Sequence, residues 1–153
     1  MSSLADLYAE LKDDVVAIAD PLFEHSRTSL QGRDFFLPHS AVLTPEGKIS
    51  LLGAMTGSKG GHANAPQVLQ MIHRGLRQMS REKVLVAVGV ATQVTLTRGE
   101  QPMTAIQVLL EHERGLTVAL TLPFHRDDEG HYFFGEAFVT PAEPELNLWM
   151  PLP

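Results

Sequence analysis

The stretch "TGSKGGHANAPQ", residues 56–67, places three glycines, a lysine and a histidine directly before a predicted helix. A helix N-terminus presents free backbone N–H groups and the positive end of the helix dipole, and both favour a bound anion. Glycine lets the backbone approach a ligand closely. We therefore consider an anion or small-molecule site within the Gly57–Pro66 loop. Its candidate ligand-binding residues are Lys59, Gly60, Gly61, His62 and Asn64.

The loop does not match the known phosphate-binding motifs. A P-loop needs Gly, four residues and then Gly-Lys-Ser/Thr, whereas Lys59 precedes the glycine pair and no hydroxyl follows it. The glycine spacing of the dinucleotide fingerprint is also absent. The second interpretation is a connector, in which the glycines let the chain leave a hairpin and Asn64 caps the next helix. Both interpretations stay open at this point.

The seven histidines show no pair with the usual spacing of metal ligands. His125 and His131 flank the turn "HRDDEGH", and paired strands could bring them within about 5 Å of each other. Acidic residues 127–129 lie between them. The alternative is a solvated turn, since charged side chains are ordinary in hairpin loops. The sequence assigns no metal ligand and no cofactor.

Candidates for catalysis are few. No Gly-x-Ser-x-Gly motif occurs, and the neighbours His39 and Ser40 point to opposite faces of a strand, so they cannot bond directly. Glu136 lies between two phenylalanines and could act as a general acid, unless it is exposed or paired with an arginine. The carboxylates of "EHE", residues 111–113, are expected to be solvated at a turn. These observations favour a non-enzymatic protein.

The apolar tail "PELNLWMPLP", residues 144–153, contains the only tryptophan. Such a tail either docks on its own domain or crosses to a partner. We expect a homodimer, formed through this tail or through an open sheet face, and a protein partner is a further option. The candidate interface residues are Leu146, Leu148, Trp149, Met150 and Leu152.

Length and charge limit the classes of function. A chain of 153 residues fits one domain, here 1–153, and the net charge of −6 opposes binding to nucleic acid. Cysteine is absent, as are a signal-peptide pattern and any apolar run long enough to span a membrane. We therefore expect a cytoplasmic protein that binds neither nucleic acid nor membrane.

Hydrophobic periodicity predicts the element order α-β-β-α-β-β-β-β. Apolar residues at three- and four-residue steps indicate a helix over 3–19, capped by Ser2 or Ser3 and ended or kinked by Pro21. In the strand over 84–97, one face carries valines and the other carries small residues, which indicates that an element packs closely on the small side. The remaining elements are a hairpin within 34–55, a helix over 65–82, and strands within 103–113, 116–124 and 131–139.

The expected fold is α+β with two layers, an antiparallel sheet of five to six strands and both helices on one face. This element order resembles the profilin-like and roadblock-like domains over residues 1–125, although the strands over 84–97 and 103–113 are longer than the roadblock pattern. The resemblance implies dimerisation and scaffolding rather than catalysis. The sequence thus favours a protein-binding or scaffolding domain that self-associates. The alternative is a small-molecule or anion-binding domain that uses the Gly57–Pro66 loop.

Overall fold

The computed structural model describes residues 3–31, 36–53 and 65–149. Neither helix in these ranges combines the length and the apolar character that crossing a membrane requires. The elements, in chain order, are α1 (Leu4–Leu30), β1 (His39–Leu43), β2 (Ile49–Gly53), α2 (Ala65–Glu82), β3 (Ala87–Arg98), β4 (Gln101–His112), β5 (Thr117–Arg126), β6 (Tyr132–Phe134) and β7 (Phe138–Pro141).

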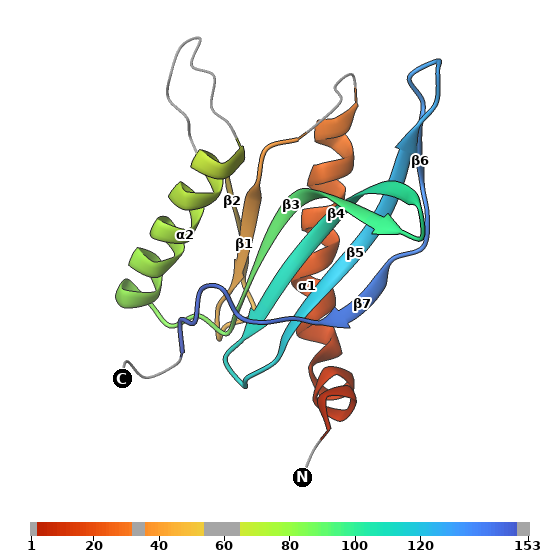
Figure 1. Cartoon of the computed structure of the whole chain (residues 1–153). Helices are drawn as coiled ribbons and strands as arrows, with labels where there is room; N and C mark the ends of the chain where they lie inside the picture. The colour runs from red at the N-terminus through yellow and green to blue at the C-terminus, as the bar shows by residue number, and fades with distance from the viewer. Residues whose placement is uncertain (1–2, 32–35, 54–64, 150–153) are drawn as a thin grey trace, which may run out of the picture.

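All strand pairs are antiparallel, in the spatial order β2-β1-β3-β4-β5-β6, with β7 on the same side of β5 as β6 (Figure 1). The α+β class and the element order are confirmed. The sheet has seven strands because the strand predicted over 131–139 is divided in two. Residues 135–137 separate β6 from β7. At the start of this break the N–H of Gly135 donates to the carbonyl of Pro123 on β5 at 2.8 Å.

Helix α1 begins as predicted and ends later than predicted. Ser3 and Asp6 form a capping box at its start. The Ser3 side chain accepts from the Asp6 N–H, and the Asp6 side chain accepts from the Ser3 N–H. The helix then continues through Pro21 to Leu30. A proline inside a helix removes one hydrogen bond and costs about 3 kcal/mol. Burial of apolar side chains beyond the proline, including Leu22 and Leu30, offsets that cost.

Helix α1 covers one face of the sheet along β1, β3 and β4 (Figure 1). The prediction of an element packed on the small face of β3 is confirmed. A Cβ built on Gly89 would lie 2.5 Å from Cγ2 of Ile18 and 2.9 Å from Cδ1 of Leu22. Only glycine leaves room for the helix at this distance.

Helix α2 packs on the opposite face, so the prediction that both helices share one face is wrong. Neighbouring strand residues point to opposite faces, and Ala41 belongs to the α1 core whereas Val42 belongs to the α2 core. The valines of β3 explain the difference, because β3 is apolar on both faces and needs a cover on each. The second core contains Val42, Val68, Ile72, Leu76, Leu85, Val88, Val90 and Leu146.

Candidate functional site

The predicted anion site cannot be placed. Lys59, Gly60, Gly61, His62 and Asn64 all lie outside the described residues, and α2 is described from Ala65 onward. The hypothesis that the loop binds an anion therefore stays a prediction.

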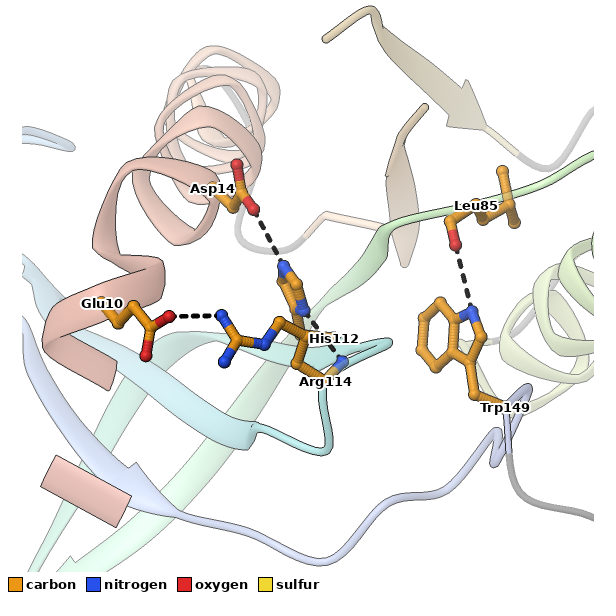
Figure 2. Close-up of polar contacts among 6 residues, drawn as sticks. All are labelled: Glu10, Asp14, Leu85, His112, Arg114 and Trp149. Atoms are coloured by element: carbon orange, nitrogen blue, oxygen red, sulfur yellow. Dashed lines mark hydrogen bonds and ion pairs between the residues drawn. The ribbon is translucent and has the colours of Figure 1, made fainter. Parts of the chain in front are cut away.

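The apolar tail packs against its own domain. Leu146 is 5% exposed and belongs to the core beneath α2, where Leu148 and Trp149 contact it. The indole Nε1 of Trp149 donates a hydrogen bond to the carbonyl of Leu85 at 3.0 Å (Figure 2). Met150 and Leu152 lie outside the described residues. Leu146 is thus buried within one copy, and an interface role for the other tail residues stays a prediction.

A buried carboxylate on β4 holds the tail in place. Glu111 is 3% exposed, and its Oε2 accepts the N–H groups of Glu145 at 3.3 Å and Leu146 at 3.0 Å. Its Oε1 accepts the N–H of Asn147 at 3.0 Å, and Asn147 has the left-handed φ of 55° that helps turn the backbone here. The prediction that Glu111 is solvated is wrong. Its pairing with Val88 on the apolar face of β3 is the signal that sequence reasoning missed.

A second polar cluster joins the β4–β5 turn to α1 (Figure 2). The backbone N–H of Arg114 donates to His112 Nδ1 at 3.1 Å, so the ring proton is on Nε2, which donates to Asp14 Oδ2 at 2.9 Å. The guanidinium of Arg114 bonds Glu10 at 2.6 Å. Both nitrogens of the buried His112 ring are therefore occupied, and the cluster fixes structure rather than offering a general base.

A second buried histidine, His39, is also part of the core. Its Nε2 lies 3.0 Å from Ser26 Oγ and 3.2 Å from the Leu22 carbonyl, and its Nδ1 lies 3.1 Å from the Leu37 carbonyl. Burial lowers the pKa of His39 below its ordinary value. A Ser–His pair is a possible nucleophile and base, but Ser26 is fully buried and a substrate could not reach it.

The histidines that flank the β5–β6 turn do not face each other. His125 pairs with Phe133, and their rings stack with centroids 5.1 Å apart. His131 is exposed, and its Nδ1 lies 3.4 Å from Asp127 Oδ2. Ligand atoms of Asp127, Glu129 and His131 lie within 4.8 Å of one another. The N–H groups of Glu129 and His131 both bond Asp127 Oδ1, so hydrogen bonding of the turn explains this geometry.

A cleft opens where the β3–β4 and β5–β6 hairpins diverge. Pairing of β4 with β5 ends at Thr104 and Phe124, although β4 begins at Gln101. The resulting hollow has a volume of about 540 Å³ and is lined by Met103, Thr104 and the aromatic residues of β5 and β6. Phe133 is 50% exposed in it. Glu136, beyond β6, is exposed, which is one of the alternatives that the sequence left open.

The free edge of β2 is the second candidate site. Within the described ranges β2 pairs only with β1, and its sequence "ISLLG" carries no charge. Bonds from Gly47 N–H to Thr44 O and from Thr44 N–H to Lys48 O fix the hairpin register. In that register the N–H and C=O groups of Ile49 and Leu51 point away from β1. The side chain of Leu51 is 51% exposed.

The opposite edge of the sheet is poorly suited to pairing. It consists of the three-residue strand β6 and the four-residue strand β7, which ends in Pro141. Short strands and prolines are common means by which proteins protect a sheet edge. The β2 edge has neither.

No family model matches the sequence, and no curated protein and no solved structure matches the chain. The resemblance to profilin-like and roadblock-like domains therefore depends on element order alone.

Proposed function

We propose that the chain is a non-enzymatic protein-binding domain that self-associates, and that two copies pair through the free edge of β2. The observation that carries this proposal is the uncharged edge with the exposed side chain of Leu51. Unprotected edges of this kind readily accept another strand.

The geometry of β2 suits a symmetric dimer. An antiparallel pair formed by two copies of the same strand has a two-fold axis, so each copy presents the same surface to the other. Centring the pair on Leu51 places the two Leu51 side chains opposite each other, where cross-strand contact stabilises pairing. The sheets of the two copies then become continuous.

In this dimer the contact lies on the β2 edge and not on the tail. Leu146 and Trp149 bind within their own domain, so truncation of residues 144–153 would expose the core under α2. Loss of dimer after truncation would therefore not distinguish an interface from a folding defect. A substitution on the β2 edge avoids this difficulty.

The test is the mass of the protein in solution, measured by light scattering. We expect a dimer for the wild type and a monomer for Leu51→Lys, because a lysine on the edge opposes pairing with an identical strand. Val84→Lys is the matched control, since Val84 is 65% exposed outside the sheet. A monomeric wild type, or a dimeric Leu51→Lys with an unchanged melting temperature, would refute the proposal.

Small-molecule binding in the cleft between the hairpins is the second candidate function. The stack of His125 on the half-exposed Phe133 favours a planar, aromatic ligand. A panel of such compounds should raise the melting temperature of the wild type and not that of Phe133→Ala. Lys59→Ala and His62→Ala test the separate loop hypothesis with phosphate-bearing compounds. If Phe133→Ala, Lys59→Ala and His62→Ala all keep the ligand-induced rise in melting temperature, binding occurs neither in the cleft nor at the loop.

A further inference from the structure

The two helices lie on opposite faces of the sheet. Their exposed faces carry opposite charges. On α1 the exposed stripe opposite the buried face is acidic. Its spacing of three, four and seven residues keeps the carboxylates in one row along the helix. These residues are Asp6, Glu10, Asp13, Asp20 and Glu24. Within the chain, Glu10 also binds Arg114 and Glu24 lies 3.6 Å from Arg27.

The exposed stripe of α2 is basic. It contains Arg74, Arg77 and Arg81 together with three glutamines, and it includes no carboxylate. The only acidic residue of α2 is Glu82, which lies to one side and accepts a bond from Gln78 at 2.9 Å. A shallow hollow of about 320 Å³ lies between the arginines. Arg77 also donates to the carbonyl of Glu145 at 3.3 Å. The charge of the stripe favours an anionic partner.

A protein surface fits this stripe better than nucleic acid does. The chain has a net charge of −6, and such a field repels a polyanion that extends beyond the helix. A local acidic row on a folded protein can contact the arginines without extending over the rest of the surface, so it meets less repulsion than a polyanion does. The same chain presents such a row on α1.

We infer that copies of this chain also associate head to tail, with the basic stripe of α2 on the acidic stripe of α1 of the next copy. The contact has an apolar component: Val16, 40% exposed, lies within the acidic row. Beside Arg74, Met71 is 46% exposed and Gly75 has open space around the position of a Cβ. Among the described residues no atom lies within 4 Å of that Cβ position, so Gly75 leaves a flat place that Val16 of the next copy can occupy.

The two contact surfaces differ from each other, so the interface is heterologous and repeats along a row of copies or closes into a ring. This inference rests on the proposed self-association, although it uses a different surface from the β2 edge. Dimers paired through β2 would join into larger assemblies when α2 of one dimer contacts α1 of the next. Because charges dominate the contact, raising NaCl from about 50 mM to about 500 mM should weaken it about tenfold or more.

The test uses reversal of charge on each helix, with mass measured by sedimentation at low and high salt. Arg74→Glu with Arg81→Glu, and separately Asp13→Lys with Asp20→Lys, should each abolish species larger than the dimer. Glu129→Lys with Glu143→Lys is the control for two reversed exposed charges, and it should assemble like the wild type. Melting temperatures verify that each variant is folded.

Restoration of assembly is the decisive result. Mixing the two reversed variants should restore large species, and so should the chain that carries all four substitutions, because the stripes are complementary again. Wild type that never exceeds the dimer at low salt would overturn the inference, as would reversed variants that still assemble or swapped charges that fail to restore assembly. Leu51→Lys removes the β2 dimer and leaves the helix contact, so failure of either interface is recognised separately.

Discussion

Replacing Glu111 with glutamine tests the polar anchor of the tail. The carboxylate accepts three backbone N–H groups with its two oxygens. Glutamine keeps one oxygen and turns the other position into an NH₂ donor, which would face a backbone donor. At least one bond is lost, and the others lose the contribution of the negative charge. Bonds to charged groups contribute about 1.5–3 kcal/mol each, so we expect a loss of about 2–4 kcal/mol.

Urea unfolding measures this loss, and Trp149 provides the signal. It is the only tryptophan in the chain, and it lies in the segment that Glu111 holds. With a slope of about 2 kcal/mol per molar urea, the midpoint should fall by about 1–2 M. If the tail detaches before the domain unfolds, tryptophan emission shifts to longer wavelength at lower urea than the circular dichroism changes.

Glu113→Gln is the matched control, because Glu113 lies two residues further along the chain and is exposed. An exposed substitution of this kind should change stability by less than about 0.5 kcal/mol. Equal midpoints for Glu111→Gln and Glu113→Gln would refute the view that the carboxylate anchors the tail.

Three further predictions concern the core. Gly89→Ala should cost about 1–3 kcal/mol in urea unfolding, because its Cβ meets Cγ2 of Ile18 at 2.5 Å; a variant as stable as the wild type would contradict close packing of α1. Burial lowers the pKa of His39, so the folded protein binds fewer protons and stability falls as pH falls below about 6.5. His39→Gln should reduce that slope between about pH 7.5 and pH 5.5, and an unchanged slope would contradict it. His112→Ala should lower the free energy of unfolding by about 2–3 kcal/mol. Asp14→Asn should lower it by less than about 1 kcal/mol, because its amide oxygen still accepts from the ring. Equal decreases in melting temperature for the two variants would contradict this prediction.

Periodicity predicted the elements well and their ends poorly. The small face of β3 predicted a closely packed neighbour, and Gly89 against Ile18 confirms it. The same pattern also predicts a packed element on the other face of β3, because the valine face is as apolar as the small face. The length of α1 could not be predicted from the local effect of Pro21, since the residues that stabilise its last turns are buried by distant strands.

The candidate sites depend on contacts between distant residues, and these were harder to predict. The apolar composition of the tail predicts that it packs against a protein surface. The place where it packs depends on Glu111, which is more than thirty positions earlier in the chain and could not be identified from the tail itself. Charge and sequence position alone suggested that Glu111 is solvated. The free edge of β2 could not be predicted from the sequence. The order of strands in space decides which strand of the described residues lies at the end of the sheet.

The order of strands also affects how the chain folds. β3, β4 and β5 each pair with the strand next along the chain, so these pairings close short loops and form with little loss of entropy. β1 reaches β3 only after the segment containing β2 and α2 has been bypassed, and α1 contacts β4 across most of the chain. We therefore expect the three-stranded meander to form early in refolding and α1 to dock late. The close contact at Gly89 then belongs to the last step, where it slows unfolding more than it speeds folding.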